Sequence, residues 1–409
     1  MLISDIEKIG KIANETRMLR SEIQQEFRDE NQLKKFSRNS FLEILGHANK
    51  VMSETKLDGI MKAMETEGYT FNRRSNGKTS PYDLTLENLY DIAENLDIKK
   101  HRNKKLPAFV AIMQNLKGGV GKSLATNKVA TAAIMLNNYL LKQLRVLIVD
   151  LDPQATTTES NIPNIVINDG DLTSIQAMAD EDLSRQDLLK YCVKKTSISN
   201  LSVIPCGTFD GFITEELNTP EIYNQTKPFA LLKNRITDKL KYDFDIILLD
   251  AGPHMDIVMK NAIAAANGIF IPVPPTYYNY DSTMRFIEKL PETIKEMLNQ
   301  GYDLNNLKFI NTFITKDPTH INSKRRHNNM VVNSVKDDLK NVFGRHNVLN
   351  NTLRLEEAYE RCTEMGGTIF TIQKSLYDGS QAAFTRAHTH ATAWVTEVID
   401  SIIDYQKEL

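Results

Sequence analysis

The chain has 409 residues, 41% hydrophobic and 25% charged, so it is long enough for more than one folded domain and too apolar to be globally disordered. Its formal net charge of −2 gives no whole-chain attraction to nucleic acid, so a DNA-binding surface would need local charge clusters. No run approaches the ~18 apolar residues of a membrane span, and neither a signal-peptide pattern nor a CxxC pair is present, which predicts a cytoplasmic protein without membrane contact.

Residues 1–35 are highly charged and carry a narrow apolar stripe. The stripe residues recur three and four positions apart, which places them on one side of a helix: Ile9, Ile12, Thr16, Leu19 and Ile23. So narrow a stripe is typical of a helix-pairing seam and predicts dimerisation. An amphipathic helix docked on its own domain explains so short a repeat equally well.

Residues 36–106 have the pattern of a small helical domain with a hairpin. A first helix in "SFLEILGHANK" precedes a second in "SETKLDGIMKAMETEGY", where Thr55 and Asp58 have capping-box spacing and Gly68 ends the helix. Alternating apolar residues around an "NG" turn predict a hairpin, and Thr85 opens a last helix. Helix, turn, helix, hairpin and helix is the order of a winged helix-turn-helix domain.

The tip of the predicted hairpin carries cations where a wing meets DNA phosphates, namely Arg73, Arg74 and Lys78. We therefore expect these residues to contact DNA. The basic linker that follows, up to Pro107, is as often a solvated connector as an interaction site.

From 107 to 409, apolar runs alternate with helix-length segments. The runs are "FVAIMQ", "RVLIVD", "LSVIP", "FDIILLD", "GIFIPV" and "LKFINTF". Strands that are continuous in Val, Ile and Leu and separated by helices predict an α/β fold, with a parallel sheet covered by helices on both faces.

The loop "NLKGGVGKS" directly follows the first of these runs. Against the phosphate-loop pattern GxxxxGK[ST], Gly121, Lys122 and Ser123 fit, whereas Leu116 stands where the first glycine belongs. Gly118-Gly119 lets the chain curl so that N–H groups point inward around an anion, and the following helix adds its N-terminal dipole. Lys122 would reach the β- and γ-phosphates of a nucleotide, and the Ser123 hydroxyl would hold Mg²⁺.

Two later strands end in carboxylates. "RVLIVDLDPQ" places Asp150 and Asp152 on the same side of an extended chain, and "FDIILLDAGPH" ends in Asp250. In a parallel sheet these strand ends lie at the same rim as the phosphate loop. A single carboxylate there would be more simply a helix cap, but three converging on a phosphate loop predict Mg²⁺–nucleotide chemistry.

The segment from Lys117 to Ser123 resembles the deviant Walker A motif of the ParA/MinD ATPases, whose hallmark is the extra lysine before the glycines. "DLDPQ" resembles the second motif of that family and "ILLDAGP" its Walker B motif; together the motifs span about 107 to 275. Leu116 departs from the pattern, because the family has glycine at this position. The departure affects how tight the first turn of the loop can be. The domain order further resembles the long ParA proteins of plasmid and plasmid-prophage partition.

This resemblance implies an ATPase that binds ATP, ADP and Mg²⁺ and works as a homodimer. Lys117 would reach the phosphates of the partner subunit's nucleotide, Lys122 those of its own, and Asp152 would orient or deprotonate the attacking water. Asp150 and Asp250 would hold Mg²⁺ through its waters. The implied nucleotide-binding residues are Lys117, Gly118, Gly119, Val120, Gly121, Lys122, Ser123, Leu124, Pro274 and Asn311. The last two, as adenine contacts, could equally be ordinary strand-end residues.

The resemblance also implies two modes of DNA binding and a ParB-type centromere-binding partner. The winged domain would read a specific operator and repress its own operon, while the ATP-bound dimer would bind DNA without sequence preference. Candidate residues for the second mode are Arg325, Arg326, Arg354 and Arg386. Arg354 is favoured because "LRLEEAYERC" resembles the family segment that carries such an arginine.

Other classes fit the chain less well. A MinD-like membrane spacer needs a basic amphipathic C-terminal helix, whereas this chain ends in the acidic "WVTEVIDSIIDYQKEL". An iron-protein reductase needs cysteines at a shared cluster, and Cys192 and Cys206 lie in no such motif. A transcriptional repressor with little ATPase activity is the remaining alternative.

Overall fold

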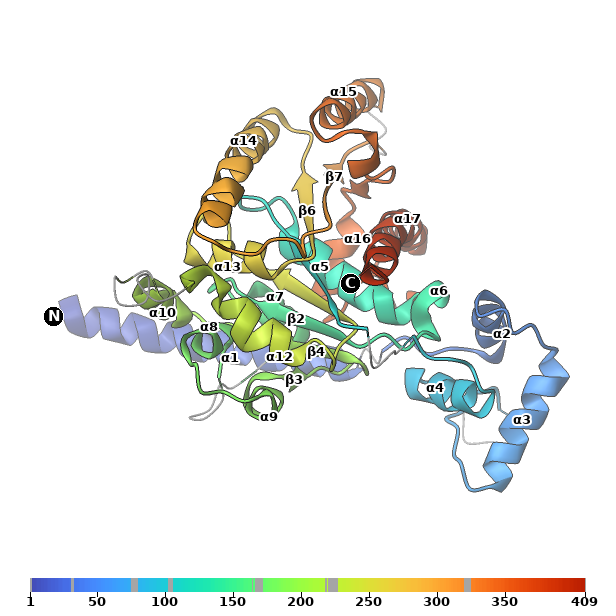
Figure 1. Cartoon of the computed structure of the whole chain (residues 1–409). Helices are drawn as coiled ribbons and strands as arrows, with labels where there is room; N and C mark the ends of the chain where they lie inside the picture. The colour runs from blue at the N-terminus through green and yellow to red at the C-terminus, as the bar shows by residue number, and fades with distance from the viewer. Residues whose placement is uncertain are drawn as a thin grey trace.

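The computed structural model describes residues 2–30, 33–74, 80–101, 106–163, 165, 172–217, 219, 227–319 and 325–408. This part of the chain forms a sheet flanked by helices, with four helices before it in the sequence (Figure 1). None of the helices found there is long and apolar enough to cross a bilayer.

The sheet has eight strands in the order β3-β4-β2-β5-β1-β6-β7-β8. Its six longer strands coincide with the six predicted apolar runs: β1 (Phe109–Met113), β2 (Val146–Asp150), β4 (Leu201–Ile204), β5 (Ile246–Asp250), β6 (Gly268–Val273) and β7 (Phe309–Asp317). All of them pair in parallel, which confirms the predicted α/β fold. The two-residue edge strands β3 (Lys194–Lys195), antiparallel to β4, and β8 (Leu353–Arg354) are too short to leave a pattern in the sequence.

Alternation along the strands divides their side chains between two helical layers. Phe109, Ala111 and Met113 of β1 belong to one buried cluster, and Val110 and Ile112 to the other. The first face is covered by α5 (Lys122–Met135), α6 (Asn137–Leu140), α16 (Glu357–Glu364) and α17 (Gln381–Gln406). The second is covered by α8 (Ser174–Ala179), α13 (Ile257–Ala265), α14 (Tyr277–Asn299) and α15 (Arg325–Phe343). Because both faces are buried, the strands are largely apolar.

Short helical segments complete the connections. They are α7 (Thr156–Asn161), α9 (Arg185–Asp187), α10 (Asp210–Leu217) and α12 (Asp238–Leu240), the π-helical turns Leu188–Cys192 and Lys233–Thr237, and the 3₁₀ turns Pro228–Ala230, Arg345–Asn347 and Lys374–Leu376.

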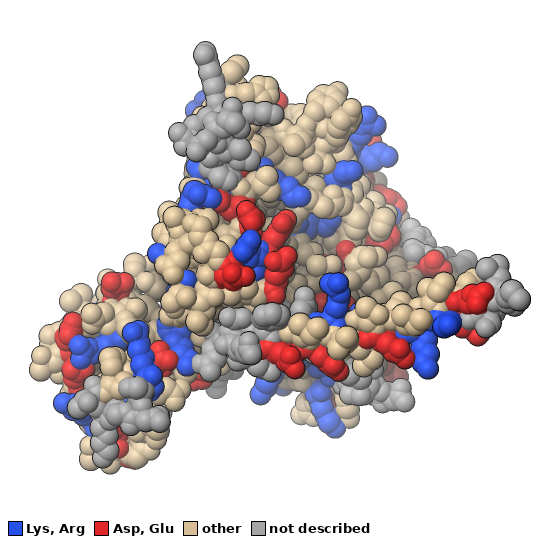
Figure 2. Space-filling view, turned by 180° about the vertical axis from the view of Figure 1, so that it is seen from behind, with Lys and Arg blue, Asp and Glu red and all other residues tan. Residues whose placement is uncertain are grey.

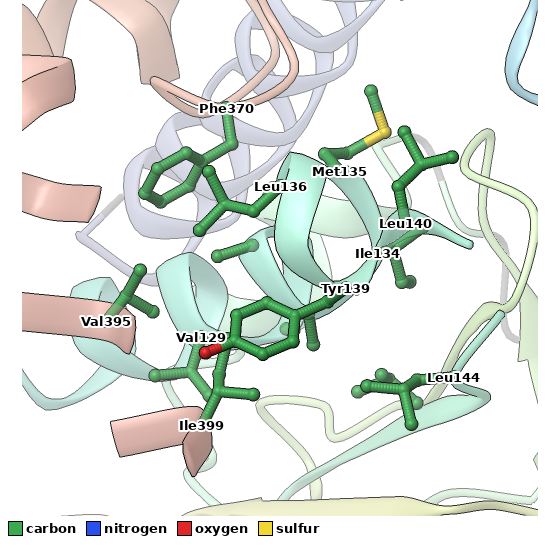
Figure 3. Close-up of a cluster of buried hydrophobic side chains, with 14 of the residues drawn as sticks. Val129, Ile134, Met135, Leu136, Tyr139, Leu140, Leu144, Phe370, Val395 and Ile399 are labelled. Atoms are coloured by element: carbon green, nitrogen blue, oxygen red, sulfur yellow. The ribbon is translucent and has the colours of Figure 1, made fainter. Parts of the chain in front are cut away.

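Helix α5 is fixed from behind by α6 and α17. Figure 3 shows Val129 of α5 with Val395 and Ile399 of α17 around the ring of Tyr139. The Tyr139 hydroxyl donates a 2.7 Å hydrogen bond to Asp400 Oδ1. This packing holds the N-terminus of α5 at the carboxyl rim of the sheet, where the glycine-rich loop ends.

The helices α2 (Arg38–His47), α3 (Glu54–Thr66) and α4 (Leu86–Asn95) lie beyond α6 (Figure 1). Their apolar side chains join the buried cluster on the α5 face, and α2 contacts α6. Thr85 caps α4 in a capping box with Asn88, and α3 ends shortly before Gly68, whose φ is +98°, as expected. The expected capping box at Thr55 was wrong, because Ser53 caps α3 by accepting from the Lys56 N–H.

A hairpin connects α3 to α4. Arg73 and Tyr82 form an antiparallel bridge, and Phe36 pairs with Leu84 beside it. The Arg74 N–H donates to the Pro81 carbonyl at 3.1 Å. The turn between the two arms, residues 75–79, lies outside the described residues. The order of a winged helix-turn-helix domain is therefore present.

Helix α1 (Leu2–Glu30) crosses one side of the sheet domain, where Arg17 lies 3.6 Å from Glu159 of α7. Its stripe is not buried against the rest of the chain, since Ile9, Ile12, Leu19 and Ile23 are 43–66% exposed. The stripe thus has room for a partner, and its role in dimerisation stays a prediction.

Candidate active site

The glycine-rich loop joins β1 to α5 at the carboxyl rim. Two of its glycines have left-handed backbone, Gly119 at φ +71° and Gly121 at φ +96°, a region that side chains disfavour. A Cβ on Gly121 would also lie 3.2 Å from the Thr315 hydroxyl of β7. Leu116, at the missing-glycine position, is half-buried and packs against the second cluster. The loop therefore requires glycine in its second half, at Gly119 and Gly121, and Gly121 is a position where the sequence matches the phosphate-loop pattern.

Asn115, which the sequence analysis did not single out, holds the start of the loop. Its buried Nδ2 donates to the Pro272 carbonyl at 2.9 Å and to the Thr283 hydroxyl at 2.8 Å. Its Oδ1 accepts from the Lys117 N–H at 2.9 Å. A buried amide directly after an apolar strand was the available signal, because such a group needs partners from elsewhere in the fold.

The two lysines of the loop have opposite environments. Lys122 is 8% exposed, and its Nζ donates to the Asn115 carbonyl at 3.0 Å across the loop. Burial lowers the pKa of Lys122, while the charges of Asp250 and Asp152 oppose that shift. Lys117 is exposed at the rim. One lysine thus points into its own loop, and the other is accessible from outside the subunit.

Asp150 and Asp250 are in register at the ends of β2 and β5. Both oxygens of Asp150 have partners, because Oδ2 accepts from the Thr158 N–H and hydroxyl at 2.8 and 2.7 Å and Oδ1 from the Asp152 N–H at 3.1 Å. Asp250 accepts the Thr157 hydroxyl on Oδ2 at 2.5 Å. Burial raises the pKa of both carboxyls, and the charge of Asp250 adds to the shift of Asp150.

Asp152 is half-buried beside the loop after β5. Its Oδ1 accepts from the Gln154 N–H at 3.0 Å, and a Cβ on Gly252 would lie 3.6 Å from its carboxylate. The side chain is therefore held at the rim, next to the loop that follows β5.

The donor set fits a nucleotide with Mg²⁺. Among the described residues, the buried Asp250 Oδ1 and Gln114 Oε1 have no hydrogen-bond partner. The nearby Ser123 side chain lowers the pKa of the Asp250 carboxyl against the larger, opposite effect of burial. No cluster of three or more His, Cys, Asp or Glu that could hold a metal occurs in the described ranges. Such sparse protein ligation is typical of Mg²⁺ held with substrate phosphates.

The expected adenine contacts lie in different surroundings. Pro274 is buried directly after β6. Asn311 is 5% exposed and pairs with Phe270, four residues before Thr315, the β7 residue that approaches Gly121. At about 3.3 Å per residue this separates Asn311 from the loop contact by about 13 Å along the strand. Both remain predictions.

The residues of the hairpin that we expect to contact DNA differ in exposure and in ion pairing. The Arg73 guanidinium lies 3.9 Å from the Tyr82 ring centroid, 2.7 Å from Glu65 and 3.0 Å from the Ser80 carbonyl, and its side chain is 20% exposed. Arg74 is 58% exposed, with Asp83 at 3.9 Å. Lys78 lies outside the described residues. Of the three, Arg74 presents the more accessible described charge.

The C-terminal arginines are also unequal. The Arg386 guanidinium donates to buried Glu356 at 2.9 Å and is 46% exposed. Arg354, in β8, is half-buried near Tyr359 and His390. Arg325 and Arg326 begin α15, but their side chains lie outside the described residues. On the face shown in Figure 2, Lys and Arg are interspersed with Asp and Glu. The DNA contacts therefore stay predictions.

A parallel sheet with a phosphate loop between β1 and α5 and carboxylates at its rim defines the class of P-loop nucleoside triphosphatases. A family model described as an AAA domain matches residues 108–305, and one described as a ParA helix turn helix domain matches residues 12–105. The chain is 32% identical to Plasmid partition protein A of Escherichia coli over 356 residues, 86% of each chain. The chain belongs to the plasmid partition protein A family.

Two solved structures share the fold. One described as "Partition Protein" superposes with a TM-score of 0.72 at 24% identity, over 99% of this chain and 97% of that one. The ATP complex of a Cyanothece McdA variant superposes with a TM-score of 0.54 at 17% identity, over 72% of this chain and 97% of that one. The wider coverage of the first includes the N-terminal helices.

Proposed function

We propose that the chain is a DNA-binding, Mg²⁺-dependent ATPase of plasmid or plasmid-prophage partition that hydrolyses ATP to ADP and phosphate. The observation that carries this proposal is that buried Lys122 interacts electrostatically with buried Asp250, whose Oδ1 has no partner among the described residues. A buried cation and a buried, incompletely bonded carboxylate beside a glycine loop are suited to a phosphate chain and its metal. Mg²⁺, when bound, neutralises phosphate charge.

Within one subunit, Lys122 and the loop N–H groups hold the β- and γ-phosphates. Asp152 orients the attacking water or takes its proton from the half-buried position at the rim. Ser123 and Asp250 hold the metal; Asp150, whose oxygens accept from Thr158 and Asp152, supports the rim instead of contacting the metal directly. ATP binding by the Cyanothece relative with this fold is consistent with these roles.

Across subunits, exposed Lys117 reaches the phosphates of the partner subunit's nucleotide. A cation supplied by a second chain stabilises the developing charge, so hydrolysis is coupled to dimerisation. The exposed stripe of α1, with Ile9 and Leu19, supplies a second contact between subunits through helix pairing.

DNA is bound in two ways. The winged helix-turn-helix domain, through α3 and the hairpin, reads an operator and represses the chain's own operon. The ATP-bound dimer binds DNA without sequence preference through C-terminal cations, with Arg354 as first candidate. The protein therefore acts in the cytoplasm, bound to the nucleoid. A ParB-type centromere-binding protein is the partner that links this ATPase to its plasmid.

The experiment is binding to a non-specific duplex without nucleotide, with ADP and with ATP, at two salt concentrations. Lys122→Ala is the matched control, since it removes the phosphate-binding cation but no DNA contact. We expect strong, salt-sensitive binding by the wild type only with ATP, and none by the variant. Binding indifferent to nucleotide would instead assign DNA to the winged domain alone and favour a repressor with little ATPase activity.

A further inference from the structure

A cavity of about 150 Å³ lies on the side of α5 away from β1, between α5, α7, residues 196–198 and the segment after α16. This volume corresponds to about five water molecules, at the ~30 Å³ that each occupies in liquid water. Side chains with hydroxyl or amide groups form most of its wall, including Asn127, Thr131, Asn161 and Thr368. Among the described residues that line it, none is Asp or Glu, and Lys128 is the charged one.

Lys128 is a buried cation without a counter-ion. It is 2% exposed, and its Nζ lies 3.9 Å from the ring centroid of Tyr359. No described residue accepts a hydrogen bond or forms an ion pair with this ammonium. The neighbouring Cys362 does not supply a negative charge, because burial raises the pKa of its thiol to about 12. A buried ammonium without an anion is costly, and burial accordingly lowers the pKa of Lys128 to about 7. An anion in the adjoining cavity would restore the charge of this lysine and pair with it.

This cavity is separate from the phosphate loop. Lys122 and Lys128 are six residues apart on α5, so their side chains leave the helix about 120° apart around its axis. Lys122 Nζ turns to the Asn115 carbonyl, whereas Lys128 Nζ lies against α16. The two lysines therefore belong to two sites on different faces of one helix.

The wall of the cavity is nevertheless joined to the candidate active site. Asn161 Nδ2 donates to Asn127 Oδ1 at 2.6 Å, Asn127 Nδ2 to Thr157 Oγ1 at 3.5 Å, and Thr157 to Asp250 Oδ2 at 2.5 Å. Ser123, whose side chain lowers the pKa of Asp250, also lines the cavity. A ligand here would sit behind the residues that we assign to the metal.

We propose that this cavity is a second, separate binding site for a small oxyanion of the phosphate class, with Lys128 as its cation. The hydroxyls of the wall, such as those of Thr131 and Ser160, donate to backbone carbonyls in the free protein and would rotate to donate to the bound anion. A tetrahedral oxyanion accepts from many donors at once, which matches a wall of hydroxyl and amide groups with a single positive charge. The site does not depend on the proposed ATPase activity, since its residues bind an anion whether or not ATP is hydrolysed.

The test is calorimetric titration of inorganic phosphate into the full chain, with the loop saturated by Mg²⁺ and a non-hydrolysable ATP analogue and with ionic strength matched by chloride. We expect one saturable site in the wild type. Lys128→Met keeps the length of the side chain over Tyr359 and should weaken phosphate binding by at least about tenfold, the loss of one charged hydrogen bond. Lys122→Ala, whose loop is not expected to hold nucleotide or phosphate, should show the same single saturable site as the nucleotide-saturated wild type.

Thr131→Val is the second variant, since it removes a hydroxyl from the wall at nearly constant volume and keeps the test decisive if Lys128→Met does not fold. It should weaken phosphate binding several-fold. The proposal is overturned if the wild type gives no saturable binding or if binding persists unchanged in both cavity variants. Loss of binding in Lys122→Ala alone would also overturn it, because phosphate would then occupy the loop.

Discussion

Asp150 and Asp250 stand side by side at the ends of neighbouring parallel strands, and only Asp250 keeps an oxygen without a partner among the described residues. Asp150 accepts three hydrogen bonds from Thr158 and Asp152. The two carboxylates are chemically identical and lie at equivalent positions, but their roles differ. Asp150 stabilises the rim through its hydrogen bonds, and Asp250 has an oxygen that is available to a ligand.

Asparagine at these two positions should separate the tasks. Asp150→Asn places an N–H₂ against a backbone or hydroxyl donor and should destabilise the protein by about 1–3 kcal/mol. Asp250→Asn keeps an acceptor for Thr157 and removes a buried charge, so stability should change little while Mg²⁺–ATP affinity falls at least about tenfold. Thermal unfolding without nucleotide and calorimetry with Mg²⁺–ATP measure the two effects. Equal effects of both substitutions on both measurements would contradict this division.

The two loop lysines should also separate. Lys122→Ala should abolish nucleotide binding, because the buried ammonium faces the phosphates. Lys117→Ala should retain nucleotide binding in the monomer and lose ATP-dependent dimerisation or hydrolysis, because its exposed charge serves the other subunit. Binding of a fluorescent ATP analogue and light scattering measure these steps. Wild-type ATP affinity in Lys122→Ala would remove the phosphate-loop assignment.

Asp152→Ala should stop hydrolysis and spare binding, since the carboxylate acts on water and not on the phosphates. We expect ATP-dependent dimers of normal affinity and phosphate release reduced by about 10²-fold or more, the range of a positioned acid or base. Gel filtration with ATP and a phosphate-release assay measure both. Unchanged turnover would exclude Asp152 from this role.

Glycine is required at one loop position and not at another. Gly121→Ala imposes a left-handed backbone costing about 1–2 kcal/mol and brings a Cβ to 3.2 Å from the Thr315 hydroxyl. Gly118→Ala is the matched control, because no atom lies within 4 Å of its Cβ. In urea unfolding without nucleotide, only Gly121→Ala should lower stability clearly. A similar loss in Gly118→Ala would mean that the free loop differs from the conformation described above.

Lys128 should make stability depend on pH. Burial lowers its pKa to about 7, from about 10.4 in an unfolded chain. Between these values the unfolded chain holds the proton that the folded chain releases, so the penalty of Lys128 falls as pH rises, by at most about 1.4 kcal/mol per pH unit. In phosphate-free buffer, Lys128→Met should be more stable than the wild type at pH 7, and this advantage should shrink towards pH 10. Parallel stability profiles would contradict the buried charge.

Several elements could be predicted because they depend on short stretches of chain. The six longer strands follow from continuous apolar runs, and Thr85 and Gly68 mark helix ends through local hydrogen bonds and backbone freedom. Convergence of the loop and the carboxylates followed from parallel pairing, which puts all carboxyl ends of strands at one rim. The start of α3 was misplaced, since Ser53 and Thr55 offer similar caps two residues apart and the helix begins after the first.

Other features depend on residues far apart in the chain. Thr157 reaches Asp250 across 93 positions and Asn115 reaches Thr283 across 168, so the sequence offers no spacing from which to find them. The same limit applies to charge. In the sequence Arg73 and Arg386 look like cations available to DNA, but in the folded chain they form ion pairs with Glu65 and Glu356.

The sequence by itself determined the class of fold, the phosphate loop and the carboxylates at its rim, because spacing along a strand or a loop fixes these features. Only the tertiary structure decided which lysine is buried and which is exposed, which aspartate keeps an oxygen without a partner among the described residues, and that Lys128 faces a cavity. The physical reason is that burial and hydrogen-bond partners are assigned by packing between distant segments, and these in turn set the charge and reactivity of each group.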